Sequence, residues 1–335
     1  MRNISRKLLL SSLTVVLTVI ALGTTTFAWF TITNTARISS FETQIAAEQG
    51  IEIAIGIINP SLEIENETKF EVSTPSRLNW VTTLTAADIE QFIQDHVETG
   101  FRFEHLTSPN GRTFYTFTSD EVGNTVTNGY VELPIHFRSG DVYTINWSAV
   151  NLNSGSPLPR WTSDVDQYTS TNGNIVNRND EIVVDPSNAV RISFDPGSGT
   201  PFVYEKPYGG TNIVLGTGGN LTQEVDPDND PETENSYIPS QIGAHSYYHA
   251  KTNLLPVGID NVVTVETFTE FASYGEEGRT VLTLNNGATS SAGMEYYGTA
   301  TIYVWIEGWD ANAYNSILDQ YVYISFTFKG ISLED

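Results

Sequence analysis

Cysteine is absent from this 335-residue chain, and basic residues are scarce in it. Without cysteine the fold has no disulfides and no thiolate metal sites, so its stability must come from a hydrophobic core. Against 40 acidic residues stand only 16 lysines and arginines, which gives a formal net charge of −24. Such acidity excludes nucleic acid as an expected partner, because phosphates would repel the chain. It favours a solvated acidic surface with some capacity for divalent cations.

Long hydrophobic runs are also missing, apart from one near the start. Three basic residues precede an apolar run over Leu8–Leu22, and a small-x-Ala site follows at Thr26-Phe27-Ala28. This order of segments is typical of a secretory signal peptide. The run is short for a membrane span, which needs ~20 apolar residues to cross ~30 Å of hydrocarbon. We predict that a signal peptidase removes residues 1–28. The alternative is an uncleaved leader, which would be the chain's one contact with a membrane.

Export without cysteine fits a bacterial envelope better than a eukaryotic secretory route. The C-terminal region carries no apolar tail and no sorting signal for covalent attachment to a cell wall. We therefore expect the chain to be secreted, or held at the extracellular cell surface of a bacterium by a partner or by its own copies.

Most of the remaining sequence predicts β-strands. Apolar and polar residues alternate, and clusters of Gly, Asn, Asp and Pro separate the alternating stretches. The clearest alternation lies in Val131–Phe137, Val142–Val150, Thr299–Ile306 and Tyr321–Phe328. We count about eight or nine core strands, the number that a jelly roll uses. The predicted fold class is all-β: a jelly-roll-like β-sandwich with one or two helices and long loop insertions.

Two local features refine this prediction. Pro134 has no N–H to donate, so its strand is expected at a sheet edge or with a bulge. Thr85 and Asp88 form a capping-box pattern in front of an apolar helical periodicity, and Gly100 is a plausible end for that helix. A shorter helix is expected over Asp310–Leu318.

The chain is expected to hold one large domain after its leader, over residues 29–335. Three stretches rich in polar residues, glycine or proline interrupt the strand pattern and predict insertions, at about 60–128, 151–186 and 195–258. Long insertions between strands cost little free energy, because the entropy of loop closure grows slowly with length.

One acidic stretch has the chemistry of a calcium site. Its acids stand at alternate positions, so that a loop could direct several carboxylate oxygens at one Ca²⁺; they are Asp226, Asp228, Asp230 and Glu232. The stretch lacks the glycine and the final glutamate of an EF-hand loop. A solvated acidic loop therefore stays the competing interpretation. A second, weaker cluster comprises Asp164, Asp166, Asp180 and Glu181.

The remaining candidates for chemistry are weak, and we predict no enzymatic activity. His245 and His249 stand four residues apart but lack the glutamate of a His-Glu-x-x-His zinc motif. No Gly-x-Ser-x-Gly nucleophile motif is present. Glu307 and Asp310 are the best pair of carboxylates for glycoside hydrolysis. The competing interpretation of this pair is a structural corner beside packed indoles, which we favour.

Two blocks of the sequence resemble exported bacterial proteins of the TasA/camelysin type, whose signal peptides are processed by signal peptidases of the SipW kind. The first block is Thr26-Phe27-Ala28-Trp29-Phe30-Thr31. The second combines Ala189–Phe194 with Val304–Asp310 and Tyr321–Phe328. The resemblance covers a minor part of the chain, mostly its ends.

What this resemblance implies is an exported jelly-roll subunit that assembles with its own copies into an extracellular filament or a biofilm matrix. The mature N-terminal segment would then add as a strand to a neighbouring subunit, a mode of binding that exposed sheet edges favour. The apolar residues buried between subunits would be Trp29, Phe30, Ile32 and Ile38. Pairing of this segment within its own sandwich is the competing expectation. A monomeric calcium-assisted adhesin or glycan-binding surface protein is the alternative function.

Overall fold

The fold is known from a computed structural model. It describes residues 41–48, 50–96, 103–117, 122–170, 174–205, 213–214, 222–225, 236–239, 244–253, 265–267, 279–286, 293–308, 310–313 and 321–332.

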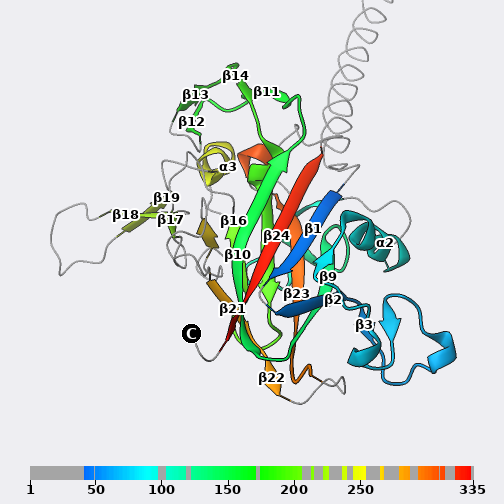
Figure 1. The fold of residues 1–335 in the computed structure, drawn as a ribbon. Helices are drawn as coiled ribbons and strands as arrows, with labels where there is room; N and C mark the ends of the chain where they lie inside the picture. Colours follow the sequence, from blue (N-terminus) through cyan, green and yellow to red (C-terminus); the bar gives the residue numbers. More distant parts are fainter. Residues whose placement is uncertain are drawn as a thin grey trace, which may run out of the picture.

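Two large β-sheets dominate the described part of the chain. The five-stranded sheet has the order β21 (Arg279–Thr283), β10 (Val142–Ser154), β24 (Val322–Ser332), β1 (Phe41–Glu48) and β5 (Thr83–Leu84). In Figure 1, β10, β24 and β1 lie side by side in front of the second sheet. The β1 strand runs parallel to β24, whereas β10 runs antiparallel to it.

The second sheet has eleven strands. Its main path is β17 (Ile213–Val214), β20 (Val265–Thr267), β16 (Phe202–Glu205), β15 (Val190–Asp195), β23 (Tyr296–Glu307), β6 (His105–Thr107), β7 (Phe114–Phe117) and β8 (Val122–Val126). Three further strands join beside this path: β9 (Val131–Ser139) pairs with β23 and with β2 (Ile51–Ile55), and β22 (Asn285–Asn286) pairs with β23. The long strand β23 thus organises this sheet.

Smaller elements complete the described fold. Four two-stranded ribbons pair β3 (Ile57–Ile58) with β4 (Glu71–Val72), β11 (Arg160–Thr162) with β14 (Glu181–Val183), β12 (Gln167–Thr169) with β13 (Ile175–Asn177), and β18 (Thr222–Val225) with β19 (Ser236–Pro239). The α-helices are α2 (Ala86–His96) and α3 (Ala244–Thr252), and the 3₁₀ turns are η1 (Ile64–Asn66), η2 (Pro75–Arg77), η3 (Pro186–Ala189) and η6 (Ala311–Ala313). Neither α-helix is long and apolar enough to cross a membrane, nor is any other helix of the described residues.

The hydrophobic core lies between the two large sheets. Phe328 on β24 is fully buried, and its ring lies 5.2 Å from that of Phe137 on β9 and 5.6 Å from that of Phe194 on β15. Trp147 on β10 packs against Phe202 on β16 at 5.3 Å. Alternating side chains of both sheets therefore meet face to face, which is the packing of a β-sandwich.

This architecture confirms the predicted fold class. The chain is an all-β sandwich with two α-helices and long excursions from its sheets. The capping box at the start of α2 is also confirmed: the Thr85 hydroxyl donates to the Asp88 carboxylate at 2.6 Å. The apolar side of α2 joins the core through Ile89, Phe92 and Ile93. Of the helix expected over Asp310–Leu318, the described residues hold only the short turn η6.

The prediction that the Pro134 strand lies at an edge or has a bulge is wrong, because neither of its two ladders shifts register at Pro134. This strand, β9, is an interior strand, paired with β23 on one side and β2 on the other. The β2 ladder ends opposite Ile135, and the Pro134 carbonyl accepts a bond from the Gly56 amide at 3.2 Å. The nitrogen and carbonyl of one strand residue point to the same side. The nitrogen of Pro134, which has no hydrogen to donate, therefore faces the side where the β2 ladder has already ended.

We expect truncation of Phe328 to show how far the fold depends on contact between the sheets. Phe328→Ala should lower the free energy of unfolding by about 3–5 kcal/mol, because it opens a cavity in the core between the two large sheets. Thr327→Ala, which changes the neighbouring side chain on the outer face of β24, should cost less than about 1 kcal/mol. Denaturant titration followed by tryptophan fluorescence measures both. Equal losses for the two variants would contradict this account of the core.

Candidate functional site

Two groups of predicted site residues lie outside the described residues. They are the candidate calcium ligands Asp226, Asp228, Asp230 and Glu232, and the candidate assembly residues Trp29, Phe30, Ile32 and Ile38. Both stay predictions. The structure does describe β1, the strand that follows the assembly segment, and it describes the sheet that β1 joins.

The five-stranded sheet is incompletely paired at one end. On β10, β21 covers the outer side from Thr144 to Trp147, and on β1, β5 covers Ile45 and Ala46. On the side of β10 away from β24, no strand of the described residues pairs with Ser148–Ser154, and the Ser154 hydroxyl bonds to Asp185 and Ser187. The same holds for the outer side of β1 from Phe41 to Gln44. We call this part of the sheet the open end.

These two stretches, one on β10 and one on β1, lie level with one another on either side of β24. Ser325 of β24 pairs with Asn151 of β10 on one side and with Gln44 of β1 on the other. In Figure 1 the open end is the upper part of the front sheet. Unpaired edge strands offer rows of backbone N–H and C=O groups to another chain. This geometry suits binding by strand addition.

The carboxylate pair Glu307 and Asp310 lies in a buried corner at the end of β23. Glu307 is 3% exposed, and one of its oxygens accepts a bond from the Trp305 indole at 3.0 Å. Its other oxygen, Oε1, is buried without a hydrogen-bond partner. Burial raises the pKa of Glu307 to about 7, with Arg191, Thr107 and Trp305 acting in the opposite direction. The structure thus holds Glu307 as a carboxyl group that resists ionisation.

Asp310 is ionically paired in the same corner. Its Oδ2 atom lies 3.0 Å from the Arg191 guanidinium, and both side chains are almost completely removed from solvent. Its Oδ1 atom accepts bonds from the backbone and side-chain amides of Asn312, at 2.8 and 2.9 Å. Arg191 also donates to the Asn188 carbonyl at 2.8 Å. These bonds tie η3, β15 and η6 together across the end of the second sheet.

This corner is built for structure rather than for hydrolysis. A glycoside hydrolase needs its two carboxyl groups on either side of a bound sugar, with access from solvent. Here Glu307 and Asp310 are 3% and 0% exposed, and both Asp310 oxygens already accept hydrogen bonds, from Arg191 and Asn312. The geometry therefore favours the structural interpretation of the pair.

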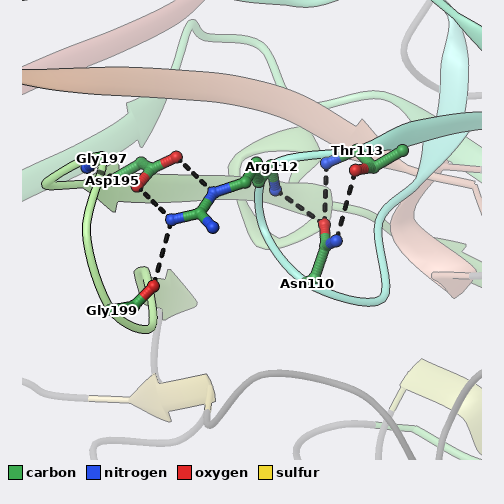
Figure 2. A network of polar contacts seen from close by, with 6 residues as sticks. All are labelled: Asn110, Arg112, Thr113, Asp195, Gly197 and Gly199. Atoms are coloured by element: carbon green, nitrogen blue, oxygen red, sulfur yellow. Dashed lines mark hydrogen bonds and ion pairs between the residues drawn. The ribbon is translucent and has the colours of Figure 1, made fainter.

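A second polar network lies on the outer side of the same sheet (Figure 2). The Arg112 guanidinium binds both Asp195 oxygens at 2.6 Å and also donates to the Gly199 carbonyl at 3.1 Å. Asn110 holds the turn that carries Arg112, because its side-chain oxygen accepts from two backbone amides of that turn. The network joins the β6–β7 turn to the β15–β16 turn.

Three of the four acids of the second cluster pair with neighbouring basic residues, and the fourth, Asp180, accepts bonds from Asn177. Asp164 pairs with Lys251 of α3, Asp166 with Arg178 and Glu181 with Arg160. Asp164 also accepts a bond from the Tyr247 hydroxyl at 2.8 Å. The Asp164 contacts, together with the packing of Tyr247 on Trp161 in a small aromatic core, dock α3 on the ribbons β11–β14 and β12–β13. The described residues contain no group of three potential metal ligands, and His249 of α3 belongs to none.

Comparison with known proteins yields no relative: no family model matches the chain, and neither a curated protein nor a solved structure was found to be similar to it.

Sequence reasoning found some of these features and missed others. Glu307 and Asp310 stood out because they follow a clear strand with two tryptophans. Arg191 was missed, because nothing in a strand pattern signals that its guanidinium is buried against a residue far along the chain. The same reason hides the pairing of Arg112 with Asp195.

We predict that Glu307 makes stability fall as pH rises from about 4.5 to about 7. In this window the unfolded chain has released the Glu307 proton, whereas the folded chain retains it, so rising pH favours unfolding. Glu307→Gln keeps an acceptor for the Trp305 indole but removes this titration. The variant should gain about 3 kcal/mol relative to the parent between pH 4.5 and pH 7.5.

Urea unfolding of both proteins across this pH range measures the difference. Taking the difference cancels the titration of all other acids. A gap between the two proteins that stays constant with pH would show that Glu307 ionises normally.

Proposed function

We propose that this protein is an exported structural subunit that assembles with its own copies into an extracellular filament or matrix. In the proposed assembly, the segment freed by cleavage of the leader, residues 29–40, adds as a strand to a sheet of the next subunit. The role is non-enzymatic, and the partner is a second copy of the chain.

The observation that carries this proposal is the open end of the five-stranded sheet. Among the described residues, β10 runs on past β21, and β1 runs on past β5, on the sides that face away from β24. Proteins that stay monomeric usually cover, shorten or charge such edges, because uncovered edges pair with other chains. An edge left open beside a buried core is therefore a binding surface for an extended segment.

The position of β1 adds to this support. It is the first described strand, and it begins next to Val322 at the open end. The residues before it in the sequence carry alternating apolar side chains, Phe30 and Ile32, between threonines. A segment of this pattern has one apolar and one polar face when extended, which is what an added strand on a sandwich requires.

The resemblance of both chain ends to TasA/camelysin-type proteins agrees with this proposal but stands on the sequence alone. For the alternative, a calcium-assisted adhesin or glycan-binding protein, no observation among the described residues speaks specifically. We therefore develop the assembly proposal only.

We expect Ile32→Asp to abolish assembly. In the proposed assembly, the new aspartate places an ionised carboxylate in the apolar contact between subunits. This burial costs more than about 3 kcal/mol and weakens association at least ~100-fold. The matched control is Thr33→Asp, which adds the same charge to the polar face of the same segment and should assemble far better. Sedimentation and negative-stain microscopy of the exported proteins measure the difference.

Three results would contradict the proposal: a parent protein that remains monomeric at high concentration, filaments that Ile32→Asp leaves unchanged, and equal losses for both variants.

A further inference from the structure

Asparagine followed by glycine is a dipeptide prone to spontaneous deamidation, because glycine has no side chain to hinder attack by its backbone nitrogen. The sequence contains four such pairs, and the structure describes both residues of two of them, Asn110-Gly111 and Asn128-Gly129. We propose that Asn128 is a site of spontaneous deamidation in the folded protein, and that the turn holding Asn110 protects the other pair. This inference does not depend on the proposed function.

The reaction needs only the chain itself and water. The backbone nitrogen of the glycine forms a bond to Cγ of the asparagine, and the bond from Cγ to the side-chain nitrogen breaks. That nitrogen leaves as ammonia, together with the proton of the glycine amide. Water then opens the five-membered ring at either carbonyl, which gives aspartate or isoaspartate. The asparagine side chain must first turn toward the next backbone nitrogen, so a side chain that is held in place reacts slowly.

The Asn110 side chain is held by three hydrogen bonds (Figure 2). Its oxygen accepts from the backbone amides of Arg112 and Thr113, at 3.0 and 2.7 Å. Its amide nitrogen donates to the Thr113 hydroxyl at 3.2 Å. Closing the ring would draw the side chain away from these partners, so the bonds must break before the reaction can proceed.

The backbone at Gly111 is also fixed. This residue is buried at a φ of 67°, and a Cβ atom placed on it would lie 2.7 Å from the Ser193 hydroxyl and 2.8 Å from the Val203 side chain. The next residue, Arg112, ties the turn to β15 through both oxygens of Asp195. The turn therefore has little freedom to bring the Gly111 nitrogen toward the asparagine.

Asn128 is in a different environment. It lies in the connection 127–130 between β8 and β9, and it is exposed. Among the described residues, no hydrogen bond or ion pair holds its side chain. Gly129 follows with a φ of 83°, a conformation that glycine adopts without strain. The Asn128 side chain can thus turn toward the Gly129 nitrogen without breaking a bond to any described residue.

Deamidation at Asn128 would disturb the residue that leads into β6. The Gly129 carbonyl accepts a bond from the Glu104 amide at 3.0 Å. A Cβ atom placed on Gly129 would lie 2.9 Å from Cβ of Glu104, so the two segments pack closely. Isoaspartate inserts an extra CH₂ group into the backbone between residues 128 and 129, and both products add a negative charge. We expect the bond between Glu104 and Gly129 to open in the modified chain.

Timed incubation of the full-length protein tests the proposal. Mildly alkaline buffer speeds the reaction, because the attacking amide nitrogen must lose its proton. Samples are digested with trypsin, which cleaves after Arg112 and so separates the two asparagines into different peptides. Fragment masses then locate each deamidation. A parallel incubation in concentrated guanidinium chloride gives the rates of the unfolded chain, in which both asparagines are free and both precede glycine.

We expect the two asparagines to react at similar rates in the denaturant. In the folded protein, Asn128 should react at least about tenfold faster than Asn110, because the Asn110 bonds must open first. Equal rates in the folded protein, or a faster loss of Asn110, would overturn the proposal. It would also be overturned if folding protected Asn128 as strongly as Asn110.

Hydrogen exchange of the Glu104 amide, measured by NMR, tests the structural consequence. The matched control is Asn128→Gln, whose longer side chain must close a larger ring and therefore reacts more slowly. Before incubation the two proteins should exchange this amide at the same rate. After incubation the parent should exchange it at least about tenfold faster than the variant. Equal exchange in the two incubated proteins would show that deamidation leaves the approach to β6 intact, contrary to this inference.

Discussion

The contact between β24 and the second sheet is the interaction on which the rest of this structure depends. β24 lies between β10 and β1, and its inward side chains, Phe328 among them, meet the rings of the opposite sheet. Because β24 is paired on both sides, it holds β1 and β10 in place even where no strand of the described residues pairs with their other sides. An open sheet end can persist in a folded subunit only if the interior strand and its core contacts are strong enough without it.

The alternation of apolar residues was sufficient to predict the sandwich, because each clear pattern corresponds to a strand buried on one face. It located β9, β10, β23 and β24, but in β10 it put Tyr143 on the same face as Ile145 and Trp147, whereas Tyr143 is exposed because the register of β10 shifts beside it. It did not predict that β9 lies inside a sheet, since Pro134 forbids one donor but does not say which side of the strand lacks a partner. Strand neighbours depend on contacts between distant residues, and these leave no local trace. The parallel pairing of β1 with β24 is another case.

The buried corner at the end of β23 illustrates the same limit for polar residues. Asp310 and Glu307 are three positions apart, but Arg191, the ion-pair partner of Asp310, lies on β15. Removing one member of a buried ion pair costs about 3–5 kcal/mol, because the other charge is left without compensation. Arg191 and Asp310 therefore fix how η6 leaves the sheet. Burial beside them raises the pKa of Glu307 to about 7, although Arg191 acts in the opposite direction.

Strand addition also reconciles self-assembly with the charge of this protein. Copies that each carry a net charge of −24 repel one another, so contacts through ordinary acidic surface are unfavourable. Backbone hydrogen bonds between strands do not depend on side-chain charge. Residues 29–38 contain a single charged side chain, Arg37, which is positive, and β10 contains none. The segment proposed to add to a neighbouring copy thus brings no negative charge of its own to the contact.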